Sequence, residues 1–184
     1  MKYNPDRHRR RSIRLKGYDY SQAGAYFVTL CTQNKECLFG EVVDGKMTLN
    51  EPGLIVEDCW EWLSKQYPHV ILDTWTVMPN HLHGIIIITH DGRGGSRTAP
   101  TVMAKRKPLG RLIGAFKTVS TKRINALRET PAVPVWQRNY FERVIRNENE
   151  LIRTSEYILN NAAHWAEDEN NPAVMDNANG HIAM

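Results

Sequence analysis

The feature that most constrains the fold is a pair of extended apolar segments separated by a short break. Residues Val70–Val77 and Leu82–Thr89 are rich in β-branched and large apolar side chains, and Met78-Pro79-Asn80 lies between them. Proline has no amide hydrogen to donate to a neighbouring strand, so it marks a turn and not a strand interior. Two strands joined this closely pair in the antiparallel sense. The sequence therefore predicts an antiparallel sheet that contains this pair.

Other segments add strands and helices around the pair. Further strands are expected at Tyr26–Thr32, at Cys37–Val43 with Lys46–Leu49 as a hairpin around Asp44-Gly45, and in the extended segment Val135–Ile145. Helical spacing of apolar residues predicts helices at Gly53–Gln66 and Leu109–Leu127, and a capping box of Asn147 and Glu150 starts a last helix that runs to about Trp165. Because hairpin junctions outnumber crossovers, the expected fold class is an α+β sandwich.

The 184 residues divide into three parts of different composition. Residues 1–17 form a basic arm, residues 18–165 a single globular domain, and residues 166–184 an acidic, Asn-rich tail that we expect to be disordered. Within the domain, residues 90–108 are rich in Gly, Ser, Pro and basic side chains, which predicts a long mobile loop.

Charge is strongly segregated along the chain. The net charge is only +4, yet residues 1–16 carry +6 and residues 93–128 carry +10, which leaves −12 for the rest. Two cationic blocks on an otherwise acidic chain indicate a polyanionic partner, nucleic acid before a membrane surface, and argue against a small cationic ligand.

Several classes of protein are disfavoured by composition. The longest apolar run, Ile85–Ile88, is far too short to span a membrane, and no apolar stretch follows the basic N-terminus as in a secretory signal. Cys31, Cys37 and Cys59 are an odd number without CxxC spacing, so neither a disulfide framework nor a thiolate zinc site is expected. A cytoplasmic protein is the expectation.

Two histidines lie at the start of the strongest predicted strand. In His81-Leu82-His83, alternation along the strand turns both rings to one side, about 6.5 to 7 Å apart along the backbone, and turns Leu82 to the other. The two rings can therefore share one cation, although two ligands do not complete a site and strand histidines are common on surfaces.

The last predicted helix offers a second pair of polar side chains. Tyr157 and Asn161 are four residues apart and lie beside the expected core stripe of Leu151, Ser155, Ile158, Ala162 and Trp165. A phenol on such a flank is held by packing while it reaches solvent. The same position also suits an ordinary tyrosine at the rim of a core.

Three motifs together resemble a known family. They are Val77-Met-Pro-Asn-His-Leu-His83, Val135-Trp-Gln-Arg-Asn-Tyr-Phe-Glu-Arg-Val-Ile-Arg146 and Tyr157-Ile-Leu-Asn-Asn161. In this order and spacing they resemble the REP-associated tyrosine transposases, relatives of the small single-tyrosine HUH transposases of bacterial insertion sequences (the IS200-like elements). The resemblance extends from about Tyr18 to Trp165.

The resemblance implies a ferredoxin-like domain in which the His-x-His strand is central in the sheet. It also implies that His81 and His83 bind a metal, that Tyr157 is the nucleophile and that Asn161 completes the metal site. One position departs from the family: Ala162 stands where a proline is usual. Because that proline shapes the helix end and carries no chemistry, the departure concerns local geometry.

The chemistry of these groups agrees with that assignment. A phenol with a pKa near 10 is a weak nucleophile at neutral pH, and a divalent cation, Mg²⁺ or Mn²⁺, would polarise a phosphate for in-line attack. The expected function is cleavage and strand transfer of single-stranded DNA through a 5′-phosphotyrosine in DNA transposition or recombination. The expected partner is a DNA hairpin from palindromic repeats, bound by a monomer or a homodimer.

Candidate DNA contacts come from the basic blocks and from the second motif. They are Arg9, Arg10, Arg11, Arg14, Lys117, Lys122, Arg123, Gln137 and Arg138. Trp136 suits either base stacking or core packing. Tyr140 is the rival nucleophile, but it lies in an extended segment beside Phe141 and has no amide or carboxylate one helical turn away, which favours packing.

Two other functions fit parts of the pattern. A non-catalytic nucleic-acid-binding protein would explain the charge segregation, with His81, His83 and Tyr157 in structural roles. A metal-dependent nuclease that activates water would use the same histidines without Tyr157. A covalent protein–DNA adduct separates both from a tyrosine transposase.

Overall fold

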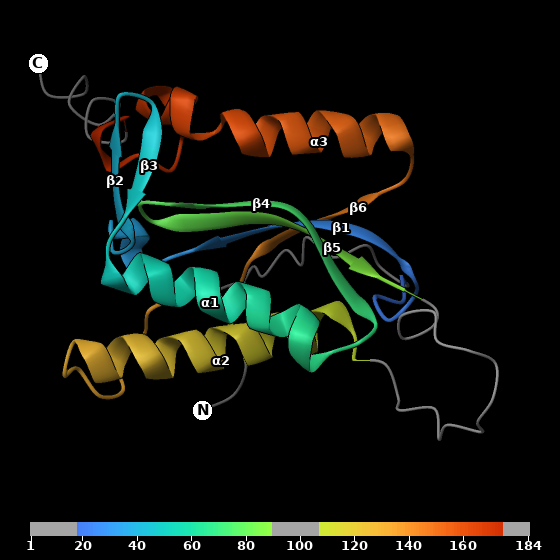
Figure 1. The fold of residues 1–184 in the computed structure, drawn as a ribbon, viewed down its shortest axis with the longest axis horizontal. Coiled ribbons are helices and arrows are strands. Elements are labelled where there is room, and N and C mark those ends of the chain that lie inside the picture. Colours follow the sequence, from blue (N-terminus) through green and yellow to red (C-terminus); the bar gives the residue numbers. More distant parts are fainter. Residues whose placement is uncertain (1–17, 90–106, 175–184) are drawn as a thin grey trace, which may run out of the picture.

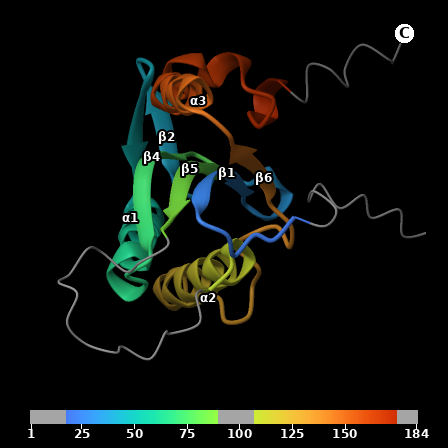
Figure 2. The same cartoon turned by 90° about the vertical axis from the view of Figure 1, so that its right-hand side faces the viewer.

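The computed structural model of the chain describes residues 18–89 and 107–174 (Figure 1). The predicted basic arm, almost all of the predicted loop at 90–108 and the end of the predicted tail lie outside these residues. The described chain forms three layers: helix α3 lies on one face of a sheet, and helices α1 and α2 lie on the other (Figures 1 and 2). The fold class is α+β, as predicted.

The sheet is antiparallel throughout and has the order β4-β5-β1-β6. Its strands are β1 (Gly24–Cys31), β4 (Val70–Met78), β5 (His81–Ile88) and β6 (Phe141–Ile145). With α1 between β1 and β4, and α2 between β5 and β6, this is the arrangement of a ferredoxin-like fold. Strand β5, which begins at His81, lies between β4 and β1, so the predicted central position of the His-x-His strand is confirmed.

A separate hairpin precedes α1. Strands β2 (Gly40–Val43) and β3 (Lys46–Leu49) pair across Asp44 and Gly45. These two residues have φ values of 50° and 71°, which a two-residue hairpin turn of this kind requires and which glycine adopts without strain. The hairpin predicted from Asp44-Gly45 is therefore confirmed. The short helix η1 (Gln33–Lys35) connects β1 to this region.

Helices α1 (Glu51–Gln66) and α2 (Leu109–Leu127) cover one face of the sheet with the main apolar core. The Asn50 side chain accepts a hydrogen bond from Gly53 N and caps α1. Trp60 on α1 packs directly against β5 at Gly84, where an added Cβ would lie 2.5 Å from the indole. Glycine at this position therefore sets how closely α1 approaches the strand that carries the histidines.

Helix α3 (Glu148–Asn160) covers the opposite face with a much smaller core of Phe27, Ile85, Ile145 and Ile158. The Asn147 side chain accepts from Glu150 N at 2.9 Å, and the Glu150 carboxylate accepts from Arg146 N at 2.8 Å. This is the predicted capping box with one difference: the Glu150 carboxylate binds the backbone N–H of Arg146 and not that of the cap residue Asn147. The start of α3 could therefore be predicted from its polar residues.

Three boundaries differ from the predictions. In Val135–Ile145, regular strand is confined to β6, and Trp136 makes only an isolated bridge to Thr32. The last α-helix ends at Asn160, and the short helix η2 (Ala162–Glu167) follows it. Residues 166–174, assigned to the disordered tail, are placed against the histidine end of the sheet, where Asn170 is buried. Because polar contacts hold this segment, the spacing of apolar residues could not predict that it is ordered.

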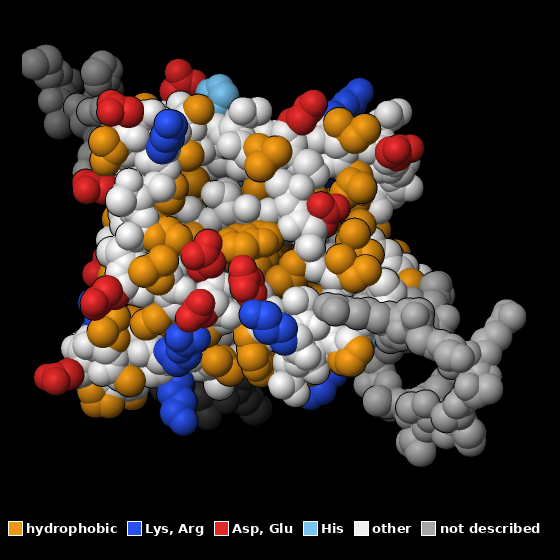
Figure 3. Space-filling model, viewed as in Figure 1, with side chains coloured by type: hydrophobic (Ala, Val, Ile, Leu, Met, Phe, Trp, Pro, Cys, Tyr) orange, Lys and Arg blue, Asp and Glu red, His pale blue; other side chains and the backbone are white. Residues whose placement is uncertain are grey.

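The surface beside β4 carries both charged and apolar groups. Figure 3 shows acidic and basic side chains close together on the lower half of this face, with exposed hydrophobic side chains between the helix layers. Among the described residues, no helix is long and apolar enough to cross a membrane.

Candidate functional site

The two histidines of β5 are buried together on the α3 face of the sheet. Their ring centroids lie 4.5 Å apart, and the two residues are 0% and 2% exposed. Leu82, between them, points to the main core on the other face. Strand alternation thus produces the pairing of rings that the sequence predicted.

Hydrogen bonds set the orientation of both rings. Asn80 donates its amide hydrogens to Lys35 O and Asn170 O, so its oxygen faces His81 Nδ1 at 2.9 Å. Because an amide oxygen only accepts, His81 Nδ1 carries the proton and Nε2 keeps its lone pair. His83 Nδ1 lies 2.9 Å from Thr29 Oγ1, which leaves its Nε2 directed into the site.

Burial keeps both imidazoles in the form that binds metals. Desolvation lowers the pKa of His81 to about 4, even though Asp168 and Asn161 act in the opposite direction. The pKa of His83 is also well below its usual value, first through burial and then through the nearby His81. Both rings are therefore neutral at pH 7, as metal coordination requires.

Tyr157 comes to the same site from α3. Its hydroxyl lies 3.3 Å from His83 Nε2, and its ring packs edge-on against Phe27 at 6.1 Å between centroids. The residue is 49% exposed, so its hydroxyl is accessible to a large substrate. Burial and the carboxylates of Asp168 and Glu169 raise the pKa of the phenol. The hydroxyl therefore carries its proton at neutral pH.

Asn161 follows α3 and is buried in the cluster, at 3% exposure. Its amide nitrogen donates to an Asp168 oxygen at 3.3 Å. Among the described residues, Asn161 Oδ1 and His81 Nε2 are both buried without a hydrogen-bond partner. Buried polar atoms are rarely left unpaired, and these two have the lone pairs that a cation would bind.

Asp168 is the site residue that sequence reasoning missed. Ligand atoms of His81, His83 and Asp168 all lie within 4.8 Å of one another, so these residues form a cluster that could hold a metal ion. The carboxylate is held by the Asn170 backbone amide at 2.6 Å and by Asn161. Its only signal in the sequence was an acidic residue seven positions after Asn161, in a segment without a pattern.

The segment that carries Asp168 is fastened by polar contacts. Lys35 Nζ donates to Glu169 O at 3.0 Å, and Asn80 donates to Asn170 O at 2.7 Å. The Trp165 ring lies 5.9 Å from that of His81. Residues 165–170 therefore cover the His81 side of the site.

Tyr140 lies elsewhere. Its ring packs against the main core on the α1 and α2 side of the sheet, with Lys117 Nζ 5.5 Å from the ring centroid. The histidines face the other side. Of the two candidate tyrosines, the structure brings only Tyr157 to the cluster.

The predicted DNA contacts fall into separate groups. Arg9, Arg10, Arg11 and Arg14 lie outside the described residues. Lys117 donates to Gln137 O and Asn139 O, and Arg123 pairs with Asp58 at 3.0 Å. Lys122 and Arg138 are exposed, and Gln137 is partly buried. Lys117, Lys122 and Arg123 lie on α2, and Gln137 and Arg138 lie in the segment after it, beside the end of β1.

Comparisons with known proteins give a relative of similar length and solved structures of similar fold. The chain is 41% identical over 175 residues to an uncharacterized protein of Haemophilus influenzae, covering 91% of this chain and 96% of the relative. A REP-associated tyrosine transposase solved bound to a REP hairpin superposes with a TM-score of 0.57 at 17% identity, covering 83% of this chain and 74% of that chain. The shared fold agrees with the resemblance found in the sequence. No family model matches the chain.

Proposed function

The chain belongs to the same family as the Haemophilus influenzae protein, and from its fold and site we propose that it is a metal-dependent tyrosine transposase of the HUH class. In this proposal it cleaves single-stranded DNA and transfers the strand through a 5′-phosphotyrosine. One observation carries the proposal: the Tyr157 hydroxyl lies 3.3 Å from Nε2 of His83, a buried histidine in a cluster whose ligand atoms are close enough together to share a metal ion.

The residues present fit a divalent cation. His81 and His83 offer neutral imidazoles, Asn161 Oδ1 is a buried acceptor with no partner in the described chain, and Asp168 adds a carboxylate. We propose His81, His83 and Asn161 as ligands, as the resemblance implies, with Asp168 beside them. Carboxylate and amide oxygens favour Mg²⁺ or Mn²⁺. Such an ion, when bound, would withdraw charge from a phosphate oxygen and so stabilise the transition state.

Tyr157 has the exposure and support that a nucleophile needs. Its oxygen attacks phosphorus, the bond from phosphorus to the 3′ oxygen breaks, and the products are a 5′-phosphotyrosine and a free 3′-hydroxyl. The phenol releases its proton to water at its half-exposed edge, and the leaving oxygen takes one from water. Phe27 keeps the ring in place through its edge-on contact. Attack by a 3′-hydroxyl reverses the step without another energy source.

Hairpin-forming repeat DNA is the proposed substrate. The fold match was solved bound to a REP hairpin, and the described cations Lys122 and Arg138 are exposed for phosphate contacts. The N-terminal arginines Arg9, Arg10, Arg11 and Arg14 complete the proposed path of the strand. The number of subunits, a monomer or a homodimer, and the cytoplasmic location stay predictions.

A trapping assay tests the proposal. The protein is incubated with short single-stranded DNA hairpins and Mg²⁺ or Mn²⁺, and a denaturing gel is searched for a covalent adduct. We expect an adduct that requires Tyr157 and is abolished by chelation of the metal.

Each alternative predicts a different gel. A nuclease that activates water gives cleaved DNA without an adduct, and its activity survives in Tyr157→Phe. A non-catalytic binding protein shifts the hairpin in a native gel and leaves it intact. Either result would overturn the proposed chemistry.

A further inference from the structure

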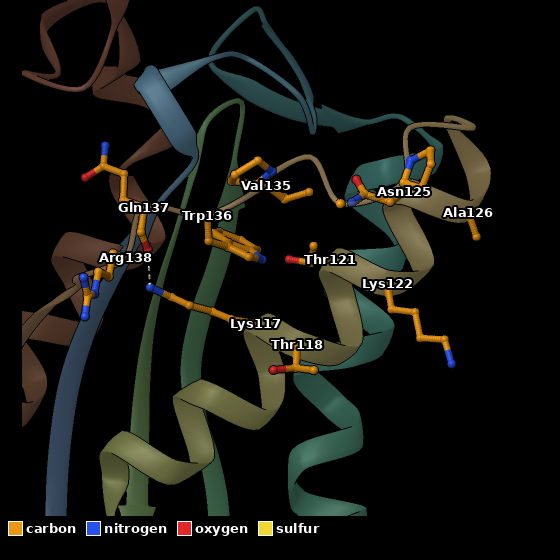
Figure 4. A pocket seen from close by; sticks show the side chains of 13 residues that line it. Lys117, Thr118, Thr121, Lys122, Asn125, Ala126, Val135, Trp136, Gln137 and Arg138 are labelled. Atoms are coloured by element: carbon orange, nitrogen blue, oxygen red, sulfur yellow. Dashed lines mark hydrogen bonds between the residues drawn. The ribbon is translucent and has the colours of Figure 1, made fainter.

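A groove separates helix α2 from the segment 131–138 that follows it (Figure 4). Its volume is about 730 Å³, within the range of sites that hold small organic molecules. The lining is mainly apolar and includes Ala126, Pro131, Pro134 and the edge of Trp136. It is distinct from the histidine cluster, because Trp136 belongs to the core on the α1 and α2 side.

Side-chain hydrogen bonds hold the two walls of the groove in place. Asn125 donates to Val133 O at 2.8 Å, and Trp136 Nε1 donates to Ser120 Oγ at 2.9 Å. Lys117 donates to Gln137 O, also at 2.8 Å, which Figure 4 draws as a dashed line. Three bonds from α2 therefore fix segment 131–138 along its length. Because these bonds fix both walls, binding in the groove should cost little conformational entropy.

The charges around the groove have one sign. Its lining residues include Lys117, Lys122 and Arg138 but neither Asp nor Glu. The Lys117 ammonium is engaged by Gln137 O and Asn139 O, whereas Lys122 and Arg138 are exposed. Figure 4 shows Lys122 and Arg138 at opposite ends of the groove. A mostly apolar floor between two cations matches a base between two backbone phosphates.

The groove is near the histidine site but turned away from it. Gln137 N donates to Cys31 O at 2.9 Å, and Cys31 is paired with His81 in the sheet. With strands about 4.8 Å apart, the backbone of Gln137 lies roughly 10 Å from that of His81. This separation is short enough for one DNA strand to contact both the histidine site and the groove.

We propose that this groove binds an unpaired nucleotide of the DNA substrate, with its base on the apolar floor and its flanking phosphates at Lys122 and Arg138. The inference rests on the proposed function and adds a binding subsite outside the chemical centre. Apolar contact with one base face is tolerant of sequence, so the groove anchors the strand more than it reads bases.

The test measures DNA binding separately from cleavage. All variants are made in a Tyr157→Phe background, and the probe is a fluorescein-labelled DNA hairpin with oligothymidine single-stranded flanks, titrated by fluorescence anisotropy. Lys122→Glu and Arg138→Glu, made separately, each remove one phosphate contact, and Ala126→Trp fills the groove. The matched controls on the same helix are Arg111→Glu, which lies outside the groove, and Gly114→Trp, where an added Cβ meets no atom within 4 Å.

We expect about a 10-fold weaker affinity for each groove variant and less than about a 2-fold change for each control. A second probe with abasic flanks separates the contribution of the base from that of the phosphates. Filling the groove with Ala126→Trp should not weaken binding of the abasic probe, because no base is there to be displaced. Circular dichroism melting verifies that every variant is folded.

Other outcomes overturn the inference. Suppose that the groove variants and the controls bind with equal affinity while the unmodified protein, which retains Tyr157, still forms an adduct. The groove then has an occupant other than DNA, and the proposed function stands. If Ala126→Trp weakens binding of the normal and the abasic probe equally, the groove does not hold a base. If neither binding nor an adduct is seen with any probe, the proposed function and this subsite fail together.

Discussion

Strand β5 contributes different kinds of side chain to the two faces of the sheet. On the α1 and α2 face, β5 contributes Leu82, Ile86 and Ile88 to a large core that includes Trp60 and Phe116. On the α3 face, it contributes His81 and His83, and among the described residues the core there has four buried apolar side chains. The thin core leaves space for polar groups, while the thick one holds the strand rigid. The strand that carries the site is therefore anchored by the opposite face, while polar contacts on the α3 face orient the two rings.

The largest difference between the faces should appear when one hydroxyl is removed from each. Tyr157→Phe should reduce adduct formation by about 1000-fold or more, because the nucleophilic oxygen is lost. Tyr140→Phe, on the core side, should leave adduct formation within about 2-fold. Quantified denaturing gels measure both, and a Tyr157→Phe protein that still forms the adduct would contradict the assignment.

The free energy of unfolding should be more sensitive to substitution on the α1 and α2 face than on the α3 face. Leu82→Ala removes a fully buried side chain from the large core and should lower the free energy of unfolding by about 2–5 kcal/mol. Tyr157→Phe removes only a half-exposed hydroxyl and should change it by less than about 0.5 kcal/mol. Urea denaturation compares the two. A larger loss for Tyr157→Phe would mean that the α3 face, and not the main core, sustains the fold.

Metal binding should depend on the α3 face alone. Asp168→Asn keeps the shape of the side chain but removes its charge, and it should weaken Mn²⁺ affinity by about 10–100-fold. Isothermal titration calorimetry gives the affinity, and the Mn²⁺-induced rise in melting temperature gives an independent reading. Glu169→Gln is the matched control, since its described contact to Lys35 uses the backbone carbonyl. Equal affinities in both variants would exclude a role for Asp168 in metal binding.

The smallest expected effect concerns pH on the α2 side. Burial lowers the pKa of Lys117 to about 8, so the folded protein releases this proton before the unfolded chain does. Wild-type stability should therefore rise relative to Lys117→Met between about pH 8 and pH 10.5, by about 1 kcal/mol or less because solvent screens the group. Paired urea titrations at pH 7 and pH 10 measure the difference. A fall in relative stability over this range would reverse the expected sign.

Regular elements were predictable because their apolar spacing is strict. Leu109–Leu127 matches α2 at both ends, and the alternation in His81-Leu82-His83 places each ring correctly. The capping residue Asn147 located the start of α3 because a cap has a fixed distance to its partner. Local rules were sufficient wherever the relevant partner is a near neighbour in the chain.

The missing parts depend on contacts between distant residues. Asp168 meets His81 across more than eighty positions, and no spacing rule connects them. Trp136 was left open between stacking and packing, and its bond to Ser120 with its burial shows that it packs. The predicted helix end, at about Trp165, lies beyond the observed end of α3 because Ala162 and Trp165 continue the apolar spacing into η2. Polar contacts outside the local helix and strand patterns decided the first two of these cases.

The amide of Asn80 has a practical consequence for anyone shortening this protein. Its orientation depends partly on Asn170 O, an acceptor in a stretch that composition alone would mark for removal. A version of the chain cut after Trp165 would lose that acceptor together with Asp168. The amide could then rotate, and His81 Nδ1 would lose the partner that keeps its proton in place. Trimming an apparently dispensable end would change the proton position on a histidine about ninety residues earlier.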